Sequence, residues 1–119
     1  MPYVDGFVIA VPKDKKAEYR DMSAKAWRIF KEAGATRQVE CWGDDVPEGE
    51  TTDFRGAVKA KEDEEIVFSW VEYPSKEVRD RANQKMREDP GMKEMGENMP
   101  FDGQRMIFGG FTPILDEHV

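Results

Sequence analysis

Residues 65–73, with the sequence EIVFSWVEY, carry the clearest strand pattern in this chain. Most of them are β-branched or aromatic, the residue types that strands favour. Side chains alternate between the two faces of a strand. One face therefore carries Ile66, Phe68 and Trp70, and the other carries Val67, Val71 and Tyr73. A strand that is apolar on both faces predicts a sheet that is covered on both sides.

Strand and helix patterns alternate on either side of this segment. Apolar runs predict further strands at 3–11, 35–43, 54–59 and 105–111. Apolar residues at three- and four-residue steps predict a helix from Asp14 to Ala33. Gly34 is expected to stop this helix in a left-handed conformation.

Two capping patterns predict helices in the second half of the chain. Ser75 is expected to cap a long helix, and Asp89 a short one that begins at Pro90. The resulting order is strand, helix, strands, helix, strand. It predicts an α+β fold of ferredoxin-like βαββαβ type with an antiparallel sheet. No linker or repeat interrupts residues 1–119, so we expect a single domain.

The charge balance argues against a nucleic-acid or membrane partner. The chain has 25 acidic and 18 basic residues, a net charge of −7. Phosphate backbones and acidic membrane surfaces both attract clustered Lys and Arg, and the one tight basic cluster, at 13–16, is diluted by Asp14. We expect no membrane span, because no apolar stretch approaches about 20 residues. A single cysteine and no signal-peptide pattern predict a cytoplasmic protein.

Apolar residues on both faces of several strands predict a homodimer. The strands at 3–11 and 105–111 resemble 65–73 in this respect. Two long helices can cover only one face of such a sheet, and a bare second face exceeds the apolar patch that monomers usually expose. The same face of a second copy would cover it in a symmetric pair. In the alternative, the short Met-rich helix and the C-terminal tail fold back over it.

Long strings of this sequence resemble the bacterial YbaA family of unknown function. They are YVDGFV at 3–8, VECWGDDVP at 39–47, TDFR at 52–55, FSWVEYPSK at 68–76 and MPFDG at 99–103. The resemblance implies a dimeric α/β barrel, in which two ferredoxin-like sheets close on each other. It also implies kinship with cofactor-free monooxygenases, haem-using enzymes and small stress-related or ligand-binding proteins. Fold alone does not assign a function.

Polar residues placed among aromatic residues on strands form the candidate ligand-binding site. Glu40 and Trp42 share a strand face, as do Trp70 and Glu72, and Asp5 lies between two aromatic residues. Carboxylates beside aromatic rings can have raised pKa values and act as general acids or bases. Arginines can pair with them or bind an anionic ligand. The candidate residues are Asp5, Glu40, Trp42, Arg55, Trp70, Glu72 and Arg105. In the alternative reading they are rim residues and ion pairs.

Other reactive residues indicate no catalytic or metal site. Cys41 is expected to be buried and inert, on the strand face opposite Glu40. His118, the only histidine, lies in the tail and gives no basis for haem ligation or a His-based metal site. The acidic residues of 44–53 lack the spacing of a calcium loop and predict a solvated turn. We expect neither a metal nor a cofactor.

Two classes of function follow from these patterns. The first is a small cytoplasmic homodimer that binds a small organic molecule between sheet and helices, with cofactor-independent acid–base or monooxygenase-like chemistry. The second is a non-catalytic interaction or stress-associated protein whose essential surface is its dimer interface. An RNA-associated protein is the third. A pocket of several hundred Å³ with convergent polar groups favours the first, and a fully packed barrel favours the second.

Overall fold

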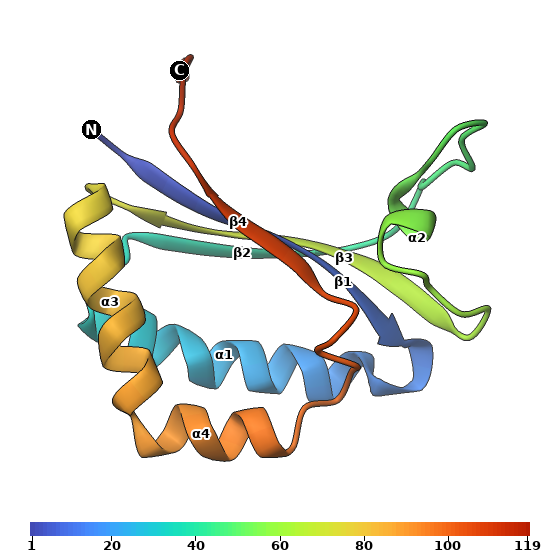
Figure 1. Cartoon of the computed structure of the whole chain (residues 1–119), viewed down its shortest axis with the longest axis horizontal. Coiled ribbons are helices and arrows are strands. Elements are labelled where there is room, and N and C mark those ends of the chain that lie inside the picture. The colour runs from blue at the N-terminus through green and yellow to red at the C-terminus, as the bar shows by residue number, and fades with distance from the viewer.

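The computed structural model describes residues 1–119 as one antiparallel sheet with a helical layer. The elements are β1 (Tyr3–Pro12), the 3-10 turn η1 (Lys13–Lys15), α1 (Lys16–Glu32), β2 (Arg37–Trp42), α2 (Phe54–Ala57), β3 (Glu64–Tyr73), α3 (Lys76–Glu88), α4 (Pro90–Glu97) and β4 (Ile107–Phe111). The strand order is β2-β3-β1-β4, and all neighbours are antiparallel. Helices α1, α3 and α4 lie on the same side of the sheet (Figure 1). The ferredoxin-like α+β prediction is confirmed.

Local capping chemistry sets the helix ends as the sequence predicts. The Ser75 hydroxyl accepts a hydrogen bond from the Val78 amide at the start of α3. The Asp89 carboxylate accepts from the first amides of α4. After α1, Gly34 has a φ of 113°, which residues with a Cβ rarely adopt. A Cβ at Gly34 would also lie 2.6 Å from the Val78 side chain, so this position requires glycine.

The predicted strand at 54–59 is wrong. Residues Phe54–Ala57 form the short helix α2 instead. Asp53 has an extended backbone and accepts a hydrogen bond from the Gly56 amide, so its side chain caps the turn before a strand can form. The strand predicted at 105–111 also begins later, at Ile107, because the Arg105 amide donates to the Asp102 carbonyl in a turn.

The helix-facing side of the sheet holds two of the three core clusters. Ile9, Val11 and Val67 pack with Tyr19 of α1. A neighbouring cluster, in which α3 contributes Ala82 and Met86, surrounds Val71 and Tyr73. The register explains this division, since paired residues of β1 and β3 such as Ile9 and Val67 point to the same side.

The other side of the sheet is only partly covered. Near α2, Val58 is buried against Ala10 and Ile66. Toward the middle, Phe68, Ile107 and Phe111 are 45–60% exposed. We call this surface the open face; its hollow of about 630 Å³ is lined by Val4, Gly6, Phe7, Val8, Phe68, Trp70, Ile107, Phe108, Gly109 and Phe111.

Neither the Met-rich helix nor the tail covers the open face. Helix α4 lies in the helical layer, where Met92 packs against the α3 cluster (Figure 1). In the tail, Ile114 and Leu115 are 100% and 75% exposed. The predicted second apolar face is therefore present and unpaired within one chain. None of the helices has the length and apolar character needed to cross a membrane.

Candidate functional site

A cleft of about 560 Å³ lies between α1 and β2. Helix α1 supplies residues 16, 19, 20, 23, 24 and 27, which share one helix face because they follow three- and four-residue steps. Strand β2 supplies Gln38, Glu40 and Trp42, which share one face because they alternate. The lining residues are Lys16, Tyr19, Arg20, Ser23, Ala24, Trp27, Thr36, Arg37, Gln38, Glu40, Cys41, Trp42 and Val67.

Glu40 is the centre of the hydrogen-bond network in this cleft. The Tyr19 hydroxyl donates to Glu40 Oε1 at 2.5 Å. Glu40 Oε2 accepts from Ser69 Oγ at 2.8 Å and from Gln38 Nε2 at 3.2 Å. Tyr19 and Ser69 are buried, at 4% and 2% exposure. Helix α1 and strand β3 thus hold the carboxylate from both sides, which fixes its direction.

The surroundings of Glu40 favour its protonated form more than water does. Loss of hydration around its carboxyl raises the pKa of Glu40, although the residue as a whole is exposed. The hydrogen bonds from Tyr19, Ser69 and Gln38 offset this only in part. Burial, followed by the negative charge of Glu40, raises the pKa of Tyr19 well above its usual range. Tyr19 therefore remains a neutral donor, and Glu40 is the group that can exchange a proton.

Aromatic rings form the walls of the cleft around this carboxylate. Trp27 of α1 and Trp42 of β2 both line it, and the Lys16 ammonium lies 5.2 Å from the centre of the Trp42 ring. This separation is that of a cation–π contact. An apolar wall with a few convergent polar groups is typical of small-molecule sites.

Trp70 and Glu72 lie on the opposite side of the sheet from Glu40 and Trp42. Trp70 Nε1 donates to Glu72 Oε2 at 2.8 Å, and Arg37 approaches the same carboxylate at 3.7 Å. Trp70 lines the open face. The predicted sharing of strand faces is present in each pair, but the two pairs do not meet within one chain.

Asp5 forms a separate ion pair beneath α3. Its carboxylate, on a residue 7% exposed, accepts from Arg79 Nε and NH2 at 2.8–3.0 Å. The Arg79 guanidinium also lies 5.1 Å from the centre of the Tyr3 ring. No sequence pattern indicated Arg79, although it stands one position from the apolar stripe of Val78 and Ala82. The pair joins β1 to α3, which is a structural arrangement.

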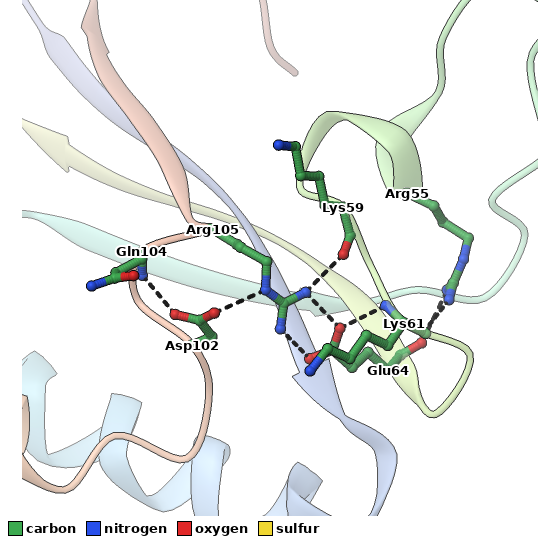
Figure 2. A network of polar contacts seen from close by, with 7 residues as sticks. All are labelled: Arg55, Lys59, Lys61, Glu64, Asp102, Gln104 and Arg105. Carbon is green, nitrogen blue, oxygen red and sulfur yellow. Dashed lines mark hydrogen bonds and ion pairs between the residues drawn. The ribbon is translucent and has the colours of Figure 1, made fainter.

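Arg55 and Arg105 converge on Glu64, as Figure 2 shows. Arg105 makes two bonds of 2.7 Å to the Glu64 carboxylate and one of 3.0 Å to Asp102. Arg55 donates to the Glu64 carbonyl at 3.0 Å and the Lys61 carbonyl at 2.7 Å. Hydrogen bonds from Arg105 lower the pKa of Glu64 to about 2. Both guanidiniums are thus held by the protein itself, away from the cleft.

The expectation that Cys41 is buried is wrong. Cys41 is exposed, because its partner in the register is Phe68 of the incompletely covered open face. Its placement on the opposite strand face from Glu40 is as predicted. His118 lies in the exposed tail. No group of three or more His, Cys, Asp or Glu side chains is arranged to hold a metal ion.

The partners of Glu40 that no sequence pattern indicated come from distant parts of the chain. Tyr19 is separated from Glu40 by 21 positions and Ser69 by 29. Tyr19 fits the apolar pattern of its helix and gives no sign of a polar role, and Ser69 carries no pattern of its own. The one local signal was the alternation of Gln38, Glu40 and Trp42 along the strand, from which Glu40 and Trp42 were predicted as site residues.

Comparison with known proteins identifies the family of this chain. The sequence model of DUF1428, proteins of unknown function, matches residues 2–103. The chain belongs to the DUF1428 family. It is 71% identical over 117 residues to the uncharacterized protein YbaA of Escherichia coli K12, with 98% of this chain and 100% of that protein covered. The Shigella flexneri YbaA protein matches with the same identity and coverage. The predicted resemblance is confirmed.

Solved structures with low sequence identity share the fold of this DUF1428 chain. A variant of SnoaB, a cofactor-independent oxygenase from Streptomyces nogalater, has a TM-score of 0.63 at 13% identity, with 97% of this chain and 95% of that chain covered. A dimeric ferredoxin-like protein from an uncultured marine organism has a TM-score of 0.58 at 11% identity, with 98% and 99% covered. Rv0793 from Mycobacterium tuberculosis has a TM-score of 0.53 at 16% identity over the whole of both chains.

Proposed function

We propose that this protein binds a small organic molecule in the cleft between α1 and β2 and exchanges a proton with it through Glu40. The observation that carries the proposal is the Tyr19–Glu40 hydrogen bond of 2.5 Å in an aromatic-walled cleft. Its volume of about 560 Å³ lies in the range of small-molecule sites. Of the seven residues predicted for the site, Glu40 and Trp42 belong to this cleft.

Glu40 has the properties of a general base or acid. Its raised pKa brings proton exchange closer to neutral pH, where such a group is most effective. Tyr19, Ser69 and Gln38 hold the carboxylate in place. The ionised form can take a proton from an acidic O–H or C–H of a bound ligand and leave a delocalised anion. Proton removal of this kind prepares an electron-rich ligand for attack by dioxygen, which is the monooxygenase-like alternative that the fold of SnoaB supports.

A ligand screen with two variants of the cleft tests this function. We expect a set of aromatic acids, phenols and amides to include compounds that raise the melting temperature of the wild type. Trp42→Ala removes a cleft wall and should abolish the shift. Glu40→Gln should retain binding but lower any turnover of the compound about 100-fold or more, the usual contribution of a general base.

Glu72→Gln is the matched control for Glu40→Gln, because Glu72 also lies beside a tryptophan on a strand but outside the cleft. It should leave both binding and turnover unchanged. If no compound shifts the wild type, or if Trp42→Ala shifts as much as the wild type, the cleft does not bind ligands of this kind.

We further propose that the functional unit is a homodimer joined through the open face. Phe68, Ile107 and Phe111 are half exposed there and surround a nearly apolar hollow. A second copy presents the same surface and can cover it by symmetry. The likeness to a dimeric ferredoxin-like protein supports this arrangement. In the non-catalytic alternative, this dimer interface is the essential surface. Substitutions in the cleft, such as Trp42→Ala, would then leave the dimer intact.

A further inference from the structure

Positive charge gathers at the cleft although the chain as a whole is acidic. Lys16 and Arg20 line the cleft, against a single carboxylate, Glu40. The whole chain has a net charge of −7. The Glu40 carboxylate already accepts three hydrogen bonds, from Tyr19, Ser69 and Gln38. The cleft is therefore the place where the local charge opposes that of the rest of the molecule.

Helix α1 separates its charges by face. Lys16 and Arg20 line the cleft. Glu18 and Asp21 lie on a different side, facing a hollow next to α4 together with Lys25. The α1 helix thus presents cations to the cleft and acidic residues elsewhere. A surface helix that only required solubility would gain from mixing the two signs at four-residue spacing.

Lys16 and Arg20 have no acidic partner. They stand four positions apart, where like charges repel on a helix. The residues three or four positions from either one include no Asp or Glu. None of the ion pairs in the structure involves Lys16 or Arg20. An anion bound between these groups would relieve their repulsion.

We propose that the ligand of this cleft is an anion with a flat apolar body, such as an aromatic carboxylate. Trp27 and Trp42 provide surfaces on which a ring can stack. Lys16, held over the Trp42 ring at 5.2 Å, and Arg20 bind the acidic group at the mouth. This inference rests on the proposed binding function of the cleft and specifies the chemical class that it accepts.

Two probes that differ only in charge test the ligand class. Binding of 2-naphthoate and of the neutral 2-naphthamide is measured by calorimetry with the full chain at low salt. We expect the carboxylate to bind about tenfold more tightly than the amide, and the difference to shrink as salt is added. Lys16→Glu combined with Arg20→Glu should abolish the preference. Lys25→Glu/Arg28→Glu makes the same charge change on α1 away from the two cations and should retain it.

The outcomes separate this inference from the proposed function. Equal affinity for the two compounds in the wild type, with binding still lost in Trp42→Ala, overturns the anionic class and leaves the cleft as a binding site. A preference that persists in the Lys16→Glu/Arg20→Glu variant also overturns it. If neither compound binds at millimolar concentration, both the ligand class and the cleft as an aromatic-ligand site are wrong.

Discussion

Glu40 and Glu64 show how position changes the chemistry of one residue type. Glu40 lies among aromatic rings and neutral donors, so loss of hydration dominates and raises its pKa. Glu64 is bound by the Arg105 guanidinium, which lowers its pKa to about 2. Glu40 therefore stabilises the fold most in its protonated form, and this contribution disappears as the pH rises through its raised pKa. Glu64 stabilises the fold most in its ionised form, and this contribution disappears as the pH falls through its lowered pKa. The first arrangement suits proton exchange, and the second suits a permanent ion pair.

Glu64→Gln should reduce both stability and its acid dependence. The ion pair of Glu64 contributes stability above its ordinary pKa of 4.5, and this contribution is lost as the pH falls toward about 2. Removing the charge should cost about 1.5–3 kcal/mol at neutral pH, the usual contribution of hydrogen bonds to charged groups. Urea unfolding between pH 2 and 7 measures the effect. The stability curve of the variant should be flatter than that of the wild type over the acid range.

Glu62→Gln is the control for this measurement, because Glu62 is exposed on the same turn. Its unfolding curve should follow that of the wild type at every pH. Parallel acid transitions for Glu64→Gln and the wild type would show that the ion pair with Arg105 does not govern acid stability.

At the scale of elements, capping determines where the chain changes direction. Ser75 and Asp89 each accept amide hydrogen bonds at a helix start, and both were recognisable in the sequence. Asp53 caps in the same way but precedes an apolar stretch, which made 54–59 resemble a strand. The error arose because side-chain capping of one turn outweighed the strand preference of the following residues.

Ser75→Ala should destabilise the protein by about 1 kcal/mol, the usual cost of losing a helix N-cap. The Val78 amide would lose its side-chain partner at the start of α3. Ser75→Asp should keep most of the stability, because a carboxylate can accept the same bond and favours the positive end of the helix. Urea unfolding midpoints measure both variants. Equal midpoints for Ser75→Ala and the wild type would contradict a role for this cap.

At the scale of the whole molecule, one layer of helices cannot cover both faces of a sheet. Helices α1, α3 and α4 lie on one side (Figure 1), and α2 with Val58 covers one end of the other side. Phe111 lies against the backbone of Gly6 and Gly109, 3.5 Å from where a Cβ of either would be. The open face is therefore smooth as well as apolar, a shape that can approach another sheet closely.

Phe68→Lys combined with Phe111→Lys should convert the proposed dimer to a monomer. Light scattering should report about twice 13.7 kDa for the wild type and 13.7 kDa for the variant. Like charges facing each other across a symmetric interface repel, and lysine is costly to bury without a partner. Lys31→Glu, on the exposed end of α1, should remain dimeric. A wild type that stays at 13.7 kDa at micromolar concentration would rule out this assembly.

Much of the fold and part of the candidate site could be predicted from local pattern. The alternation in 65–73 predicted a strand with two apolar faces, and Glu40 with Trp42 was recognised as a polar–aromatic pair. The partners of the carboxylates could not be predicted. Tyr19 reaches Glu40 across 21 positions, Arg79 reaches Asp5 across 74, and Arg105 reaches Glu64 across 41. No periodicity in a sequence records which distant side chain meets a given carboxylate.

The sequence by itself determined the order of the main elements, the caps at Ser75 and Asp89 and the presence of a second apolar face, because these depend on the spacing of neighbouring residues. Only the tertiary structure decided that Glu40 lines a cleft while Glu72 lies on the opposite side of the sheet, and that Cys41 is exposed. Strand pairing and helix packing set which faces meet, and they depend on contacts between residues far apart in the chain.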